Sequence, residues 1–241
     1  MRYAIDICFD GTNYAGWQRQ LNAMSVQQRI EDAMAVLLGQ EIPIVGAGRT
    51  DAGVHARQLI AHFDYEAPLP EKFLHSLNGM LPYDIAVNDL FVPEDPEFHA
   101  RFSAVARGYT YQIVRRKSPL YRTQAMWVRH ALDVPAMQQA ANLLFEYSEF
   151  GSFCKAHADN QTNICRIDEA RFEQSGELLL FHIGADRFLR GMVRAIVGSL
   201  LWVGSGRWSV EDFRAAVEAQ DRRAAGPAAD AHGLFLVKVE Y

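Results

Sequence analysis

The chain alternates apolar and polar residues in a way that predicts a mixture of strands and helices from its first residues onward. Residues 2–9 (RYAIDICF) alternate loosely between the two classes and predict a strand. A helix is predicted to begin at Ser25, because SVQQ is a capping-box pattern. Apolar residues recur after it at helical spacing, at Val26, Ile30, Met34 and Leu37. Further elements predicted in this half are strands over 42–45 and 59–63, a helix over 71–80 and a strand over 85–92. Their order is βαββαβ.

The second half of the chain can be divided in the same order. Its predicted elements are a strand over 109–114, a helix over 134–145, strands over 165–172 and 178–183 around the turn QSGE, a helix over 188–203 and a strand over 234–239. A further helix over 210–219 has no counterpart in the first half, and the halves share little sequence. We therefore expect an α+β protein with two ferredoxin-like βαββαβ halves, residues 1–100 and 101–241, joined near Pro93 and Pro96. We expect their mainly antiparallel sheets to form a central platform with a cleft, with the helices packed on the outer face.

The composition is that of a globular protein. Of the 241 residues, 49% are hydrophobic, enough to bury a substantial core. No apolar run approaches the roughly 20 residues of a membrane span, and the first residues lack the apolar stretch of a secretory signal. Three cysteines, Cys8, Cys154 and Cys165, cannot form a closed set of disulfides, which fits a reducing compartment. We expect a cytoplasmic protein with no membrane partner.

Charge is unevenly distributed along the chain. The formal net charge of -5 argues weakly against a nucleic-acid partner, because phosphate binding depends on clustered lysines and arginines. Residues 99–132, however, carry seven basic residues and no Asp or Glu, whereas residues 84–97 carry five acids and no base. A solvated charged face is the ordinary interpretation of such a run. The distribution therefore leaves a polyanionic partner open.

The stretch GAGRTDAGVHARQ, residues 46–58, is the main candidate for chemistry. It does not fit a dinucleotide-binding loop, because its glycines have the wrong spacing and Asp51 would repel a pyrophosphate. Asp51 and His55 alone would make half of a metal site. Two interpretations remain. Asp51 is a carboxylate kept ionised by Arg49 as a nucleophile or base, or the two form a structural ion pair that stiffens a hairpin.

Five segments, taken in order, resemble one known family. They are FDGTNYAGWQRQ (9–20) followed by SVQ, GRTDAGVHA (48–56), RFSAVARGYTY (101–111), DRFLRGMVRAIVGSLLWVGSG (186–206) and GLFLVKVEY (233–241). Together they are similar to the motifs of the tRNA pseudouridine synthase A family from end to end. One departure lies in AGPAADAHGL (225–234), where a proline is more usual in place of Asp230.

The resemblance implies an RNA isomerase that works without a cofactor or a metal. The bond from ribose C1′ to N1 of uracil would break, the base would rotate, and C5 would join C1′. The resemblance implies that Asp51 is the nucleophile, with the site of its attack left open between C1′ and the base. Arg49 would pair with Asp51, and Tyr109 would pack on the uracil as a candidate proton acceptor. The family also implies a homodimer that acts on uridines of the tRNA anticodon stem-loop, positions 38 to 40.

The residues themselves favour these roles. A uridine stacked in a helix must turn out into a pocket before a carboxylate can reach it, and an aromatic platform offsets part of that cost. On a strand, Tyr109 shares one face with Arg107 and Tyr111, of which we expect Tyr111 to be core. Arg187, Arg190 and Arg194 are spaced to share one face of the predicted helix and to bind the RNA backbone. We also expect substrate contacts from Trp17, Gln18 and His55, with Asp10 shaping their loop.

Other classes of function stay open. A zinc site of Cys154, His157 and Cys165, with His182 as a fourth ligand, has no common spacing. A non-catalytic tRNA-binding or folding factor would not depend on Asp51. A metal-dependent phosphodiesterase built on Asp51, His55 and His62 would be inhibited by a chelator, although the sequence has no dense carboxylate cluster to support it.

Overall fold

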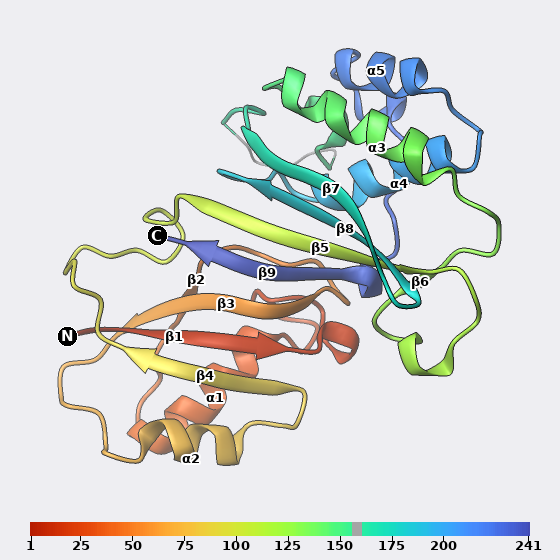
Figure 1. The fold of residues 1–241 in the computed structure, drawn as a ribbon. Helices are drawn as coiled ribbons and strands as arrows, with labels where there is room; N and C mark the ends of the chain where they lie inside the picture. The colour runs from red at the N-terminus through yellow and green to blue at the C-terminus, as the bar shows by residue number, and fades with distance from the viewer. Residues whose placement is uncertain (156–160) are drawn as a thin grey trace. The chain divides into compact units, whose positions relative to one another are not determined.

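Strands and helices alternate along both halves of the chain in the computed structural model, which describes residues 1–155 and 161–241 (Figure 1). The chain divides into two units. The first contains residues 1–105 together with 235–241, and the second contains residues 106–234. Each unit has its own strands and helices, so the mixed α and β character expected from the sequence is present in both.

The first unit is built around β1 (Arg2–Phe9). This strand pairs antiparallel with β3 (His55–Asp64) on one side and with β4 (Ile85–Phe91) on the other. The short β2 (Val45–Gly46) pairs antiparallel with β3, and β9 (Leu234–Glu240) pairs parallel with the start of β3. The sequence predicted β1, β3 and β4, but β3 begins four residues earlier than expected, at the end of the glycine-rich stretch.

Two helices, α1 (Val26–Leu38) and α2 (Phe73–Met80), cover one side of this sheet (Figure 1). The predicted start of α1 is confirmed, because the Ser25 hydroxyl accepts a hydrogen bond from the Gln28 amide at 3.2 Å. The helix ends where Gly39 adopts a left-handed conformation, with φ of 70°. Alternate side chains of β1 and the apolar stripes of both helices form the core, among them Ile5, Ile7, Ile30, Met34, Phe73 and Leu77.

The strand predicted over 42–45 is wrong for most of its length, since only β2 is a strand in that region. The reason lies in the hydrogen bonds of Ile44. Its amide donates to the buried carboxylate of Glu31 at 3.1 Å, and its carbonyl accepts from the Gln27 side chain at 2.9 Å. Side chains of α1 therefore satisfy the backbone groups that a neighbouring strand would otherwise occupy. Arg19 pairs with Glu31 at 2.9 Å and compensates its burial.

The second unit has a sheet in the order β5–β8–β7. Its strands β5 (Ala106–Val114), β8 (Leu178–Ala185) and β7 (Ile167–Ser175) are antiparallel neighbours, and the short β6 (Met126–Trp127) runs parallel to the end of β5. The chain also contains short 3-10 helices, η1 (Gly11–Asn13), η2 (Pro119–Tyr121), η3 (Leu143–Glu146), η4 (Gly151–Phe153), η5 (Arg222–Ala224) and η6 (Ala231–Gly233).

Three helices pack with this second sheet, α3 (Val134–Asn142), α4 (Met192–Gly204) and α5 (Val210–Glu218) (Figure 1). Nearly all of α4 is buried, so this helix forms the centre of the unit. The sequence predicted a helix from residue 188, but α4 begins at Met192. Gly191 precedes it in a left-handed conformation, with φ of 72°, and a right-handed helix cannot continue through that residue.

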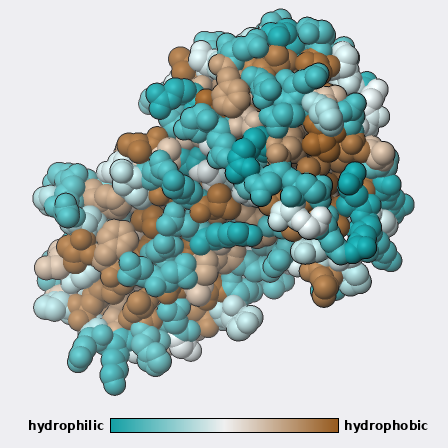
Figure 2. All heavy atoms as spheres, viewed as in Figure 1, coloured by the Kyte–Doolittle hydropathy of each residue, from teal (hydrophilic) through white to brown (hydrophobic). Residues whose placement is uncertain are grey.

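Hydrophilic side chains and small hydrophobic areas are interspersed on the face of the molecule shown in Figure 2. Among the described residues, no helix combines the length and the apolar character needed to cross a membrane. The hydrophobic residues instead build the two cores.

The loop that carries Asp230 packs closely on α4. A Cβ on Gly198 would lie 1.7 Å from the Pro227 carbonyl oxygen, so only glycine allows this approach. The Arg194 side chain donates to the Ala229 carbonyl at 2.7 Å, and the Tyr111 hydroxyl donates to the Asp230 carbonyl at 2.8 Å. Asp230 has φ of -57° and ψ of 140°, a conformation that proline also adopts. The loop therefore has a proline-compatible backbone at Asp230 without the proline.

Replacing this residue should stabilise the protein. We expect Asp230→Pro to raise the free energy of unfolding by about 0.4–1 kcal/mol, because the ring restricts the unfolded chain and costs no native strain. Urea unfolding would measure the change. Asp230→Ala is the control for loss of the carboxylate, and a proline variant no more stable than the alanine variant would contradict the expectation.

Candidate active site

Asp51 lies in the loop between β2 and β3. The loop leaves β2 at Ala47, whose amide donates to the Ile60 carbonyl at 2.7 Å. It closes with a turn in which the Val54 amide donates to the Asp51 carbonyl at 3.2 Å and Gly53 has φ of 78°. Asp51 is partly exposed and Arg49 is exposed. The turn therefore holds the main chain of Asp51 while its side chain retains access to solvent.

A second loop, residues 10–17, supports the Asp51 loop through backbone hydrogen bonds. The Gly53 amide donates to the Tyr14 carbonyl and the Trp17 amide donates to the Thr50 carbonyl, both at 3.3 Å. A Cβ on Gly11 would lie 2.0 Å from the Val54 carbonyl oxygen. A Cβ on Gly16, which has φ of 94°, would lie 2.3 Å from the Thr50 carbonyl oxygen. Both glycines are therefore required for direct contact between the two loops.

Trp17 and His55, which the sequence analysis expected to contact the substrate, are buried beside the Asp51 loop. Their side chains are only 2% and 1% exposed. The Trp17 ring packs against Gly46, where a Cβ would come within 2.6 Å of the indole nitrogen. His55 Nδ1 accepts a hydrogen bond from the Gly11 amide at 3.1 Å, and its ring stacks on Phe235 at 4.5 Å. The two aromatic rings are therefore packed beside Gly46 and Gly11 respectively.

Tyr14 and Asp84 form a support that the sequence analysis missed. The Tyr14 hydroxyl donates to the Asp84 carboxylate at 2.5 Å, and the Asp10 amide donates to the Asp84 carbonyl at 2.9 Å. Burial, together with the hydrogen bond to Asp84, raises the pKa of Tyr14 well above its usual value. This ties the loop of residues 10–17 to the start of β4. In the sequence, Asp84 stands out only as part of an acidic run. Nothing in its local sequence indicates Tyr14, 70 residues away, as its partner.

The hydroxyl of Thr50, next to Asp51, is buried and has no hydrogen-bond partner in the described part of the chain. Leaving a buried hydroxyl unpaired costs about 1–3 kcal/mol. Such groups in a native protein often mark a place where strain or function is accommodated. The unpaired group lies in the same loop as the candidate nucleophile.

The second unit carries Tyr109 and Arg107 on β5, two residues apart on one face of the strand. Tyr109 is partly exposed and meets the Phe188 ring edge-on at 5.1 Å. Arg107 is also partly exposed and donates to the Asp186 carbonyl at 3.0 Å. Tyr111 is fully buried, as expected for a core residue. Exposure therefore decreases along this face of β5 from Tyr109 to Tyr111.

The three arginines near α4 do not share one helix face, so that expectation is wrong. Arg187 and Arg190 precede α4, and Gly191 separates them from Arg194 within the helix. Arg190 is exposed and Arg187 partly exposed. The guanidinium of Arg194 hydrogen-bonds the Ala229 carbonyl, which gives this residue a structural role in the second unit. Gln18, in the first unit, is exposed.

No group of three or more His, Cys, Asp or Glu side chains is placed to bind a metal within residues 1–155 and 161–241. His157 lies outside the described residues. Cys154 and Cys165 are buried, and burial raises the pKa of the Cys165 thiol to about 11. His62, an alternative ligand, accepts a hydrogen bond from the Ala100 amide at 3.1 Å, and burial lowers its pKa.

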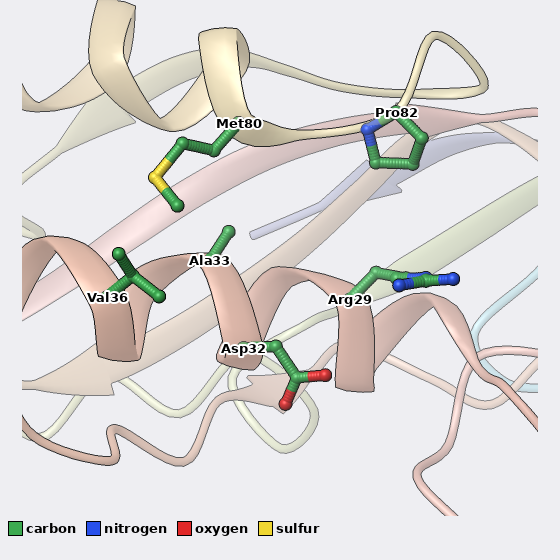
Figure 3. Close-up of a pocket in the computed structure, with 6 residues that line it drawn as sticks. All are labelled: Arg29, Asp32, Ala33, Val36, Met80 and Pro82. Carbon is green, nitrogen blue, oxygen red and sulfur yellow. The ribbon is translucent and has the colours of Figure 1, made fainter.

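A shallow groove lies between α1 and α2 (Figure 3). Its lining residues are Arg29, Asp32, Ala33, Val36, Met80 and Pro82. None of them is a predicted site residue. The first unit therefore presents Asp51 on a backbone-supported loop and not in this groove.

Comparison with known proteins identifies the family. The family model described as tRNA pseudouridine synthase matches residues 140–241. The chain is 50% identical to tRNA pseudouridine synthase A of Parabacteroides distasonis over 242 residues, covering 100% of this chain and 96% of the relative. The protein of the same name from Bacteroides fragilis is 49% identical with the same coverage, and that from Sinorhizobium fredii is 42% identical over 100% of this chain and 99% of the relative. Similarity of this extent over the full length shows that the chain belongs to the tRNA pseudouridine synthase A family, a family of RNA-modifying isomerases.

Proposed function

We propose that this protein converts uridine to pseudouridine in the anticodon stem-loop of tRNA, at positions 38 to 40, with Asp51 as the nucleophile and no cofactor. Its relatives are named for a reaction on tRNA. The observation that carries the assignment of Asp51 is the construction of its loop. Glycine contacts fix the backbone on both sides of Asp51, while the carboxylate keeps access to solvent. A carboxylate held in this way loses little freedom when it attacks, which favours reaction.

The reaction needs a nucleotide turned out of its helix, because a stacked uridine cannot present C1′ or C6 to a carboxylate. Tyr109 supports this step in our proposal, since its partly exposed ring can stack on the uracil and contribute about 1–3 kcal/mol. Its hydroxyl oxygen is our candidate to take the proton that C5 loses when the new bond to C1′ has formed, with the hydroxyl's own proton released to solvent. Arg49 pairs with Asp51 in this proposal and keeps the carboxylate ionised.

RNA contacts are assigned to side chains of both units. We propose that Arg107, Arg187, Arg190 and Gln18 contact the substrate, because all four are at least partly exposed. Arg194 contacts the substrate in this proposal while its guanidinium keeps the hydrogen bond to the Ala229 carbonyl. Trp17 and His55 act through the Asp51 loop that they support.

The wider setting is also part of the proposal. We infer a cytoplasmic homodimer that presents basic surfaces of two copies to one tRNA, because a single chain has a net charge of -5. We also infer that the division into residues 1–100 and 101–241 reflects two ferredoxin-like halves with a cleft. The strand order β4–β1–β3, with β2 antiparallel to β3, supports this assignment for the first half.

Removing the carboxylate charge of Asp51 tests the proposed nucleophile. We expect wild-type protein to release tritium from tRNA that carries [5-³H]uridine in buffer with chelator and no added cofactor, because C5 must lose its hydrogen. Asp51→Asn should lower the rate by roughly a thousandfold or more, as loss of a nucleophile does. Asp89→Asn, which changes an exposed acid on β4, is the control and should keep full activity. If a folded wild-type protein bound tRNA without release, the protein would instead be a non-catalytic binding factor, and inhibition by chelator would indicate a metal-dependent enzyme.

The contact between the two loops can be tested through Gly11. We expect Gly11→Ala to displace the Val54 carbonyl, to destabilise the protein by about 1–3 kcal/mol and to lower kcat, because the new methyl group has no room. Thermal unfolding and tritium release would measure both effects. Gly79→Ala is the control, since a Cβ there meets nothing within 4 Å in a helix and should be tolerated. Full activity of a folded Gly11→Ala variant would disprove the dependence of the site on this contact.

The hydroxyl of Tyr109 can be separated from its ring. We expect Tyr109→Phe to lower kcat by about a hundredfold or more with little change in tRNA affinity, because the stacking surface is kept and the proton acceptor is lost. Tyr111→Phe removes a hydroxyl two residues along the same face and should cost only about 1 kcal/mol of stability, from the bond to the Asp230 carbonyl. Equal kcat for Tyr109→Phe and wild type would leave Tyr109 as a stacking residue alone.

A further inference from the structure

The connection that follows β5 and includes β6, residues 115–129, carries a concentration of positive charge that the site described above does not use. It makes up most of the second half of the basic run of residues 99–132. Its exposed cations are Arg115, Arg116, Lys117, Arg122 and Arg129. The next acid along the chain is Asp133, whose side chain caps α3 by accepting from the Ala136 amide at 2.9 Å. Positive charge without an intervening acid is thus concentrated in this segment of the second unit.

Backbone pairing makes this connection compact. β6 returns parallel to the end of β5, with Val114 opposite Trp127, and the Val128 amide donates to the Val114 carbonyl at 3.0 Å. The two ends of the connection therefore lie side by side (Figure 1). Between them, η2 is followed by a turn in which the Ala125 amide donates to the Tyr121 carbonyl at 3.0 Å. The cations of the connection are therefore carried by a short segment whose two ends are paired.

Little of this charge is neutralised by the protein. Arg116 pairs with Glu177 in the turn between β7 and β8, whereas Arg115, Lys117 and Arg122 form no ion pair in the described part of the chain. Elsewhere in the second unit, two exposed arginines are neutralised by neighbouring acids. Arg171 pairs with both Glu169 and Glu173, and Arg223 pairs with Asp221 at 2.6 Å. The connection thus differs from an ordinary solvated face, in which charges of both signs alternate.

The connection also presents flat and apolar groups beside its cations. The guanidinium of Arg129 lies over the Trp127 ring at 4.6 Å, and Trp127 is 39% exposed. Leu120, at the centre of η2, is 88% exposed. Guanidinium groups and aromatic rings are the surfaces on which unpaired nucleotides stack, and clustered cations replace the counterions of a phosphate backbone. The chemistry of the connection fits RNA.

We propose that residues 115–129 bind the backbone of the substrate RNA as a surface that contributes affinity and takes no part in the chemical step. This inference rests on the proposed function, which supplies a polyanionic substrate. It also explains how a chain with a net charge of -5 binds tRNA, because the favourable charge is local.

The test compares two double variants that change the net charge by the same amount. Arg115→Gln with Lys117→Gln removes two cations of the connection and leaves the Arg116–Glu177 pair in place. Arg171→Gln with Arg223→Gln removes two cations that acids already neutralise. For full-length tRNA, we expect the first variant to raise Kd and KM roughly tenfold or more at physiological salt and to leave kcat unchanged. The slope of log K against log salt should fall by about 1.5, the value for two lost phosphate contacts. The second variant should match wild type in all of these quantities.

Three outcomes would overturn the inference. Unchanged Kd and salt slope in the first variant would show that the connection does not contact RNA and would favour an acidic protein as its partner. Equal effects of the two variants would show that only the net charge matters. A fall in kcat at unchanged KM would place the connection in the chemical step. Failure of the proposed function is distinguishable, because wild type would then release no tritium, while the salt dependence of tRNA binding would still test residues 115–129.

Discussion

Direct contact between two backbones holds the candidate active site in place. Gly11 and Gly16 bring one loop against the carbonyl groups of Val54 and Thr50, on either side of Asp51. Neither contact leaves room for a side chain, so the separation between the loops is set by main-chain atoms, which cannot change rotamer. Buried side chains of the first unit support this contact. Trp17 and His55 fill the space beneath the loops.

In the second unit, glycines allow a loop to pack closely on a helix. Its central helix, α4, is buried, and glycines on the helix and in the loop of residues 225–230 allow the loop to lie directly on it. Arg194 and Tyr111 then bind carbonyl groups of that loop. Arg194, which the sequence analysis assigned to RNA binding, therefore also has a structural role. Other exposed cations of the unit include Arg190 before α4 and those of residues 115–129.

The sequence predicted elements well where hydrophobic periodicity determines them, as in β1, α1, β4 and β8. It failed where hydrogen bonds from distant side chains replace a strand, as at Ile44, and where one left-handed glycine delays a helix, as at Gly191. For the site, the glycine-rich stretch indicated Asp51. It could not distinguish residues that touch a substrate from residues that hold the loop, because Trp17 and His55 are chemically suited to both roles. Burial decides between them, and burial depends on contacts between segments far apart in sequence.

The contact between the two loops also links catalysis to the folding of the unit. The loop of Asp51 is in contact with residues that lie 33 to 43 positions earlier in the chain. Such long-range contacts form only when the strands between which they lie have come together. Local opening that separates Gly11 from Val54 would release both loops at once, as a single cooperative unit. An assembled first unit, and not the short signature around Asp51, is therefore the smallest part of the chain that can hold Asp51 in position.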